Sequence, residues 1–314
     1  MSTPDTLPQN AVTGFQELRE RARALGAKKV CVVAAEDDVA LGAASAAMEL
    51  GIATPILVGH PTKIRFKAAE IDLSDALDHA EVVAADSAQD AARIAVAMVR
   101  EGKADLLLKG HLRTDELLHA ALDRETGLRT GRLLSDVLLY EDTLSGKSRL
   151  VGISDGGINV LPNFEQKQQI ILNSIEAMRA IGFARPKIAL MSATEIVSES
   201  VPSTVEAKRL TEWALDAKLD ADVYGPLALD NALLVSAAEA KGITHPVAGR
   251  ADVLIMPNIE AGNLLGKGVK YLGGSRCAHV VVGAKVPVLI PSRVESVDDK
   301  VNSIAFGVLV SHAR

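Results

Sequence analysis

Short runs of aliphatic and β-branched residues alternate with alanine-rich stretches along the whole chain. Each run is apolar at consecutive positions, which is typical of strands that are buried on both faces of a parallel sheet. The runs that we expect to form strands are 28–35, 54–59, 104–110, 149–154, 187–193, 251–258 and two segments within 279–291.

The stretches between these runs carry apolar residues at the spacing of an α-helix. Val297, Val301, Ile304 and Val308 are one such series, and they would form one apolar face of a helix. Strands and helices that alternate in this way predict a doubly wound α/β architecture.

One polar interruption indicates how the chain divides into domains. EDTLSGKSR (141–149) precedes a fresh strand, and a single helix follows VPVLIPS near the end of the sequence. One helix is too little to form a domain alone. We therefore expect a discontinuous first α/β domain, residues 1–147 and 293–314, and a second α/β domain, residues 148–292.

Charge and composition narrow the choice of partners. Lys and Arg number 34 against 40 Asp and Glu, a net charge of −6 with no basic block, and aromatic residues make up 3%. These values argue against nucleic acid or an anionic membrane as the partner. A small anionic ligand is still compatible, because a local cluster of arginines can outweigh a weak net charge. No apolar run approaches the roughly 18 residues of a membrane span, and we expect a cytoplasmic protein.

The sequence predicts no metal site. Cys31 and Cys277 lie far apart and match no CxxC or zinc spacing, and the histidines are scattered. Cys31 lies in an apolar run and is expected in the core, while Cys277 fits either burial or a place near a site.

Polar residues follow four of the predicted strands directly. Open parallel sheets bind ligands beyond the carboxyl ends of their strands, where helix N-termini offer free N–H groups. Four clusters with basic and amide groups therefore favour a site for a negatively charged ligand. Their members are Lys109, His111, Arg113 and Thr114; Asp155 and Asn159; Gly262 and Asn263; and Ser292 and Arg293.

Each candidate also has a purely structural interpretation. Ser296 and Asp299 match a capping box, in which the carboxylate stabilises a helix start, although a capped carboxylate can still accept a proton. Arg293 suits bidentate binding of phosphate or a surface ion pair with Glu295. Ser292 could simply end a strand, and SDGGINV around Asp155 could be a tight turn.

Known signatures of other enzyme classes are absent from the sequence. GxSxG, GxGxxG and GxxxxGK[ST] do not occur, which disfavours a serine hydrolase of the α/β-hydrolase type, a Rossmann dehydrogenase and a P-loop NTPase.

Several longer motifs occur together and in a fixed order. They are KGHLRTDELLHAALDRETGLRTGR (109–132), ISDGGINVLPNFEQK (153–167), VPSTVEA (201–207), GPLALDNAL (225–233) with Asn231, PNIEAGNLLGKGVKYLGG (257–274) and VVVGAKVPVLIPSRVESVDDKVNSIA. This series resembles the phosphate acetyltransferase/phosphate butyryltransferase family from about residue 15 onward. GLRTG and GPLALDNA are more similar to the butyryltransferase-type and fused branches than to the dedicated acetyltransferases.

The resemblance implies the reaction acyl-CoA + phosphate ⇌ acyl phosphate + CoA. It also implies two α/β domains with a cleft between them, similar to the isocitrate/isopropylmalate dehydrogenase-like fold. A homodimer is expected, with 148–292 as the dimerisation domain. CoA or acyl-CoA and phosphate would be substrates, with no tightly bound cofactor and no metal at the chemical step.

The same resemblance assigns roles to individual residues. Asp299 would be the general base, Arg293 the phosphate-binding arginine and Ser292 the hydroxyl near the reacting carbonyl. Substrate-binding residues would be Lys109, His111, Arg113, Thr114, Arg129, Asp155, Asn159, Asn231, Gly262 and Asn263. One position departs from the dedicated acetyltransferases, because His119 replaces an arginine, so Arg113, Thr114 or Arg129 would have to supply phosphate contacts.

Three alternatives stay open at this point. Butyryl rather than acetyl could be the preferred acyl group. A decarboxylating dehydrogenase dependent on a metal and NAD shares the expected fold, and a non-catalytic protein that binds acyl-CoA or phosphate would keep the same site.

Overall fold

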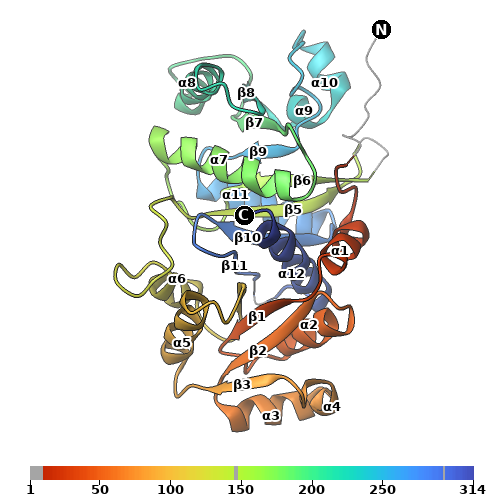
Figure 1. The fold of residues 1–314 in the computed structure, drawn as a ribbon. Helices are drawn as coiled ribbons and strands as arrows, with labels where there is room; N and C mark the ends of the chain where they lie inside the picture. The colour runs from red at the N-terminus through yellow and green to blue at the C-terminus, as the bar shows by residue number, and fades with distance from the viewer. Residues whose placement is uncertain (1–9, 145–147, 293) are drawn as a thin grey trace. The chain divides into compact units, whose positions relative to one another are not determined.

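The computed structural model describes residues 10–144, 148–292 and 294–314. The chain divides into two compact units, each built from segments that are distant in sequence (Figure 1). Unit 1 contains the N-terminal segment to Phe15 and Leu133–Cys277, and unit 2 contains Gln16–Arg132 and Ala278–Arg314.

Unit 2 follows the strand–helix alternation predicted for the first part of the chain. Its elements are α1 (Phe15–Ala24), β1 (Lys28–Val33), α2 (Asp38–Glu49), β2 (Ala53–Gly59), α3 (Pro61–Glu70), α4 (Ser74–Leu77), β3 (Glu81–Ala84), α5 (Ala88–Arg100), β4 (Leu106–Lys109), α6 (Thr114–Ala121), β10 (Cys277–Val282), β11 (Val288–Leu289) and α12 (Val297–His312).

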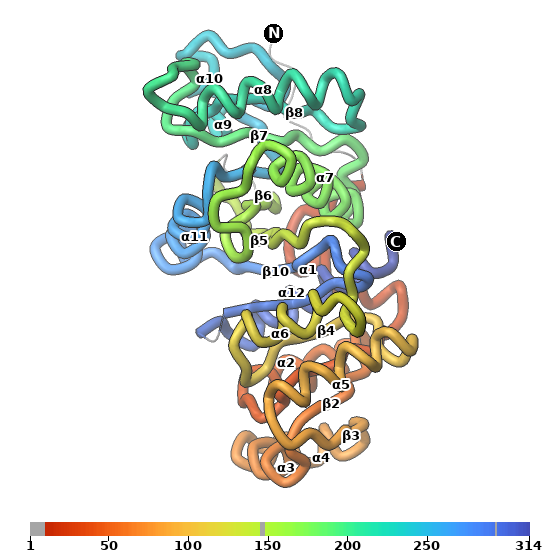
Figure 2. Tube along the Cα trace, turned by 90° about the vertical axis from the view of Figure 1, so that its left-hand side faces the viewer, coloured from red at the N-terminus to blue at the C-terminus, as the bar shows by residue number. Residues whose placement is uncertain are grey.

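The strands of unit 2 form a sheet in the order β3-β2-β1-β4-β11-β10. Neighbours from β3 to β11 are parallel, while β10 and β11 are antiparallel. Helices cover both faces, with α5 and α6 on one and α2 and α12 on the other (Figures 1 and 2). The sheet is therefore doubly wound, as its continuous apolar runs predict.

Unit 1 contains the remaining elements. They are β5 (Ser135–Asp142), β6 (Arg149–Ser154), α7 (Phe164–Ala180), β7 (Lys187–Met191), α8 (Pro202–Asp216), β8 (Asp222–Leu227), α9 (Leu229–Leu233), α10 (Val235–Ala240), β9 (Val253–Ile255), α11 (Ile259–Lys267) and the π-helical turn η1 (Gly268–Leu272).

The strands of unit 1 follow the order β5-β6-β9-β7-β8. All neighbours are parallel except β5 and β6. Figure 2 shows α7 on one face of this sheet and α11 on the other. A core with Leu254, Leu227 and Val247 fills the space beneath α9 and α10, so this unit is an α/β layered structure too.

The structure differs from the sequence-based expectation around residues 141–149. The two ends of this stretch belong to the antiparallel strands β5 and β6, in which Asp142 pairs with Arg149, while residues 145–147 between them lie outside the described residues. The stretch therefore joins two strands of one unit. The units instead change at 132/133 and 277/278, whereas we expected 147/148 and 292/293. A hairpin turn and an interdomain linker have the same polar composition, which explains the difference.

Among the described residues, no helix combines the length and the apolar character that crossing a membrane requires.

Candidate active site

The first turn of α12 holds Asp299 in a fixed, buried position. Ser296 is the N-cap of α12, and its Oγ accepts a hydrogen bond from the backbone N–H of Asp299 at 3.2 Å. In return Asp299 Oδ2 accepts bonds from the backbone N–H and the Oγ of Ser296, at 3.3 and 2.6 Å. Asp299 is 1% exposed. The predicted capping box is therefore confirmed, and it leaves a desolvated carboxylate at the helix start.

Ser292 lies in the segment between β11 and α12, and Glu295 holds its backbone. Ser292 is exposed, and its N–H donates to Glu295 Oε1 at 2.9 Å. Glu295 Oε1 also lies 3.3 Å from His279 Nε2 on β10. Glu295 is buried. Arg293 itself lies outside the described residues.

Electrostatics favours the ionised form of Glu295. Burial raises the pKa of this carboxyl, but the charge of His279 and its hydrogen bond outweigh that effect, so the pKa lies below its ordinary value. One carboxylate oxygen, Oε2, is buried and has no hydrogen-bond partner among the described residues.

The candidate phosphate contacts after β4 lie in varied surroundings. Lys109 is buried at the end of this strand, and its Nζ donates to Leu112 O at 3.4 Å. His111 is exposed. Arg113 is the N-cap residue of α6, and its exposed side chain pairs with Asp115 at 3.0 Å. Only exposed groups of this segment could therefore reach a ligand without rearrangement.

Two further candidates of unit 2 flank that segment. Thr114 is the first residue of α6 and is partly exposed, while Arg129 is exposed and forms an isolated β-bridge with Ala284.

In unit 1, the loop after β6 encloses the carboxylate of Asp155. Its Oδ1 accepts hydrogen bonds from the N–H groups of Gly157 and Ile158, at 2.7 and 3.0 Å. Its Oδ2 accepts from Asn159 Nδ2 at 2.6 Å, and the same amide donates to Leu134 O at 2.8 Å. The two polar residues of SDGGINV are thus brought together, as a single hydrogen-bonded loop.

Gly262 and Asn263 lie against this loop from α11. A Cβ at Gly262 would lie 2.4 Å from the backbone oxygen of Asp155 and 2.8 Å from Gly156 Cα. Asn263 Nδ2 donates to Gly156 O at 3.1 Å. The close approach of two backbones explains why glycine is required at position 262. Asp155, Asn159, Gly262 and Asn263 therefore form one cluster, which we name the Asp155 cluster.

A second carboxylate, Asp136 on β5, acts on Asp155. The pKa of Asp155 is raised to about 6. Burial is the largest cause and the charge of Asp136 is the second, while the hydrogen bonds from Gly157, Asn159 and Ile158 lower the pKa in part. Asp136 is itself 3% exposed. Near neutral pH this cluster can therefore exchange a proton.

Asn231 does not belong to the Asp155 cluster. It is fully buried in α9, and its Nδ2 donates to Glu195 Oε2 at 3.0 Å. Lys241 Nζ lies 3.1 Å from the same oxygen. The other amide atom of Asn231, Oδ1, has no hydrogen-bond partner among the described residues.

Sequence reasoning missed three residues that act on the candidates. They are His279, Glu295 and Asp136. His279 and Glu295 lie in or beside the predicted runs of 279–291, whereas Asp136 lies in a strand that was not predicted. The spacing of residues does not reveal which strand neighbours pair. A charged residue inside an apolar strand, such as Asp136 in SDVLLY, was the available signal, because buried charges need partners.

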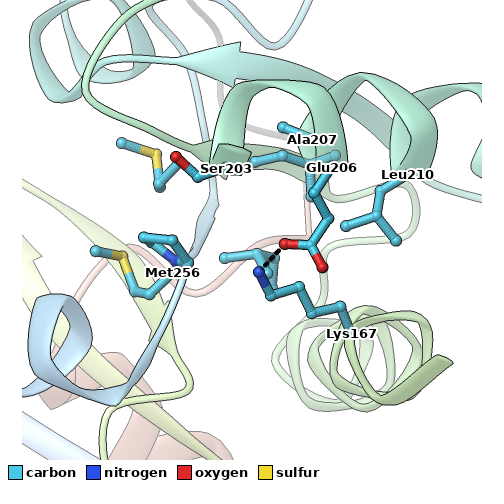
Figure 3. A pocket seen from close by; sticks show the side chains of 10 residues that line it. Lys167, Ser203, Glu206, Ala207, Leu210 and Met256 are labelled. Atoms are coloured by element: carbon cyan, nitrogen blue, oxygen red, sulfur yellow. Dashed lines mark hydrogen bonds and ion pairs between the residues drawn. The ribbon is translucent and has the colours of Figure 1, made fainter. Parts of the chain in front are cut away.

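A small pocket in unit 1 contains none of the predicted site residues (Figure 3). Lys167 of α7 pairs there with Glu206 of α8, beside Ser203 and Met256. Across residues 10–144, 148–292 and 294–314, no three His, Cys, Asp or Glu side chains are grouped so as to hold a metal ion.

Comparisons with known proteins agree on the class of the chain. The family described as phosphate acetyl/butaryl transferase matches residues 77–308. A phosphate acetyltransferase of Rhizobium meliloti is 40% identical over 96% of this chain and 94% of its own length. A phosphate butyryltransferase of Clostridium beijerinckii is 38% identical over 95% and 97%.

Solved structures show the same fold. A branched-chain phosphotransacylase from Enterococcus faecalis superposes with a TM-score of 0.80 and 28% identity, over 91% of this chain and 99% of that one. A 4-hydroxythreonine-4-phosphate dehydrogenase from Burkholderia phymatum, at 12% identity and a TM-score of 0.55 over 90% and 98%, shares the fold alone. The expected dehydrogenase-like α/β fold is confirmed.

These matches define the chain as an acyltransferase enzyme. Within that class, it belongs to the phosphate acetyl/butaryl transferase family.

Proposed function

We propose that the chain catalyses acetyl-CoA + phosphate ⇌ acetyl phosphate + CoA through a ternary complex, with Asp299 as the general base. The observation that carries this proposal is the burial of Asp299 in the first turn of α12, within the same short segment as the exposed Ser292. Family membership supplies the reaction, and the position of Asp299 supplies a base that is held rigidly.

The reaction begins with the thiol of CoA, whose pKa of about 8.5 keeps it mostly protonated at neutral pH. Asp299 takes the proton, a role worth typically about 10²–10⁴ in rate. The capping box holds the Asp299 carboxylate in one orientation, and burial keeps competing water away from it. The desolvated surroundings of Asp299 support this role.

The thiolate then attacks the carbonyl carbon of the acyl phosphate. A carbon–sulfur bond forms, the bond to the phosphate oxygen breaks, and phosphate leaves with that electron pair. Ser292 donates a hydrogen bond to the developing oxyanion, and Arg293 binds the phosphoryl group and offsets its charge. No covalent acyl-enzyme forms, so neither cysteine has a chemical role.

The remaining candidates bind substrate in this proposal. Lys109, His111, Arg113, Thr114 and Arg129 surround the phosphoryl group, and the Asp155 cluster binds the CoA side. The burial of Lys109 and the pairing of Arg113 with Asp115 make His111, Thr114 and Arg129 the more accessible contacts. Asn231, which is buried away from solvent, acts on the substrate only through Glu195.

A second candidate is phosphate butyryltransferase activity. Similarity to a butyryltransferase and to a branched-chain phosphotransacylase favours it. Acetyl and butyryl differ by two methylenes, each worth about 0.8 kcal/mol when buried. Measured kcat/KM values for acetyl-, propionyl- and butyryl-CoA with phosphate decide between the two, since a larger acyl pocket raises the value for butyryl-CoA.

One pair of assays tests the function itself. We expect phosphate-dependent release of free thiol from acetyl-CoA, and no reduction of NAD or NADP with or without Mg²⁺. Reduction of the nucleotide would instead support the dehydrogenase. If neither reaction is observed, the result would support a non-catalytic binding protein. We further propose that the protein is cytoplasmic and forms a homodimer through residues 148–292. Sedimentation equilibrium of the full chain measures the mass of the assembly and so tests whether it is a dimer.

A further inference from the structure

The segments that carry Ser292 and Asp299 are both attached to one residue of the neighbouring strand. His279 on β10 uses its side chain for the first attachment, because Nε2 lies 3.3 Å from Glu295 Oε1. That same carboxylate oxygen accepts the N–H of Ser292 at 2.9 Å. The ring of His279 therefore holds Glu295, and Glu295 holds the backbone of Ser292.

The backbone of His279 makes the second attachment. Its N–H donates to Ser303 Oγ at 2.9 Å, and Ser303 Oγ donates to the backbone oxygen of Asp299 at 3.0 Å. Ser303 is fully buried. A single residue of β10 is thereby connected to both ends of the segment 292–299.

Burial makes these attachments stronger than surface contacts. Glu295 is 6% exposed and the side chain of His279 is 16% exposed. A hydrogen bond to an ionised carboxylate is shorter and stronger than a neutral one, and loss of the His279 ring leaves the buried Glu295 carboxylate without this partner. The Glu295 side chain holds Ser292 through Oε1, and the backbone N–H of Glu295 also donates to Ser292 O at 3.2 Å.

We propose that His279 is a positioning residue for the acyl transfer, which fixes Ser292 through Glu295 and the first turn of α12 through Ser303. It touches neither substrate; it keeps the hydroxyl and the carboxylate at a constant separation while the thiolate attacks. This inference rests on the proposed function. A misplacement of about 1 Å at a reacting group can cost about 100-fold in rate, so the effect belongs in kcat.

The test compares His279→Ala with His279→Gln in the full-length protein. Glutamine carries an amide N–H at a reach similar to that of Nε2, so it can still donate to Glu295. For His279→Ala we expect kcat to fall at least tenfold while KM for phosphate and for acetyl-CoA changes less than threefold. His279→Gln should recover at least fivefold of that loss.

A matched control separates positioning from general destabilisation. Glu206→Gln removes the partner of the buried Lys167 in unit 1, which is the same kind of lost ion pair at a different place. We expect its kcat to stay within twofold of the wild type although its melting temperature falls. If Glu206→Gln lowers kcat as much as His279→Ala, the positioning role is wrong.

Amide hydrogen exchange gives a readout that does not depend on catalysis. Peptides covering 286–296, which contain the Ser292 N–H, should exchange at least tenfold faster in His279→Ala than in the wild type and near the wild-type rate in His279→Gln. Equal exchange in all three proteins, or equal kcat in the two variants, would overturn the proposal.

Two further outcomes are also decisive. If His279→Ala does not fold, the double variant His279→Ala/Glu295→Ala removes the buried carboxylate together with its partner. Its kcat should be at least tenfold below the wild type and its 286–296 peptides should exchange at least tenfold faster. Slow exchange contradicts the proposal. If the wild type transfers no acyl group to phosphate, the proposed function fails, and the exchange rates still decide whether His279 fixes the Ser292 segment.

Discussion

Asp298 and Asp299 are neighbours in the chain, but their carboxylates have opposite surroundings. Asp298 is half exposed, and its Oδ1 lies 2.5 Å from Arg19 Nη2. Asp299 is 1% exposed and accepts a hydrogen bond from Ser296 Oγ at 2.6 Å. Two acidic residues that are equivalent in the sequence are thus separated by the turn of the helix into a surface group and a buried one.

This contrast predicts different effects of the same substitution. Asp299→Asn should lower kcat by about 10²–10⁴ because the amide cannot accept the thiol proton, with KM values within threefold. Asp298→Asn loses only an exposed ion pair, worth at most about 1 kcal/mol, and should keep kcat within twofold. Steady-state kinetics with acetyl phosphate and CoA, followed by the loss of free thiol, measures both, and near-normal turnover of Asp299→Asn would end the assignment of the base.

Ser296 joins helix capping to the proposed chemistry. Ser296→Ala removes the N-cap of α12, a loss of about 1 kcal/mol, and also removes a hydrogen bond to Asp299. We expect the melting temperature to fall by about 2–4 °C and kcat to fall about tenfold.

Ser87→Ala is the matched control for that experiment. Ser87 caps α5 in the same way, accepting the Asp90 N–H at 3.1 Å. It should lose a similar amount of stability with kcat unchanged. Equal kinetics in the two variants would show that Ser296 serves the helix alone.

The raised pKa of Asp155 predicts how the stability of the folded protein depends on pH. The pKa is raised from 3.8 to about 6, first by burial and then by the charge of Asp136. Between about pH 4 and pH 6 the folded protein binds a proton that the unfolded chain releases. This contribution to stability is complete below pH 4 and is lost as the pH rises through 6, a change of about 3 kcal/mol.

Urea unfolding of the wild type and of Asp136→Asn measures this contribution. Removing the charge of Asp136 lowers the pKa of Asp155, so the variant should lose less stability between pH 4 and pH 7. An identical pH dependence in both proteins would contradict the coupling of the two carboxylates.

Gly262 predicts a steric requirement at the Asp155 cluster. In Gly262→Ala the new Cβ would lie 2.4 Å from a backbone oxygen, so the loop or α11 must shift. Overpacking of this kind typically costs about 1–3 kcal/mol, and KM for acyl-CoA should rise. Gly268→Ala is the control, because the structure leaves open space around the new Cβ. Thermal unfolding should show no loss of stability, and kinetics should show no rise in KM for acyl-CoA.

Both thiols should be inert in the folded protein. Cys31 is fully buried, and burial together with the charge of Glu81 raises its pKa to about 12. Cys277 is 1% exposed. Because the thiolate is the reactive form, Ellman's reagent should label no thiol in the native state and two after unfolding in guanidinium. Rapid labelling with loss of activity would contradict the absence of a cysteine from the mechanism.

The sequence was sufficient wherever a property depends on neighbouring residues along the chain. Continuous apolar runs predicted β1, β2, β4 and β6, and the serine–aspartate spacing predicted the start of α12. Such patterns are local, so no tertiary information is needed to interpret them.

Properties that depend on distant residues were not accessible in this way. The apolar run of β6 does not show that it pairs antiparallel with its neighbour, because an apolar strand has the same composition in either direction. The pairing of His279 with Glu295 joins β10 to the segment between β11 and α12, and no spacing rule connects them. Strands β3, β5 and β8 were not predicted, and charged residues interrupt their apolar runs at Glu81, Asp136 and Asp222.

The order in which the ribosome makes the chain has a consequence for the sheet of unit 2. Strand β4 pairs with β1 on one edge and with β11 on the other, yet all of Leu133–Cys277 is translated between them. In the nascent polypeptide one edge of β4 stays unpaired throughout that interval, and unpaired strand edges recruit other chains. Messages truncated before residue 288 should therefore yield products that aggregate or require chaperones.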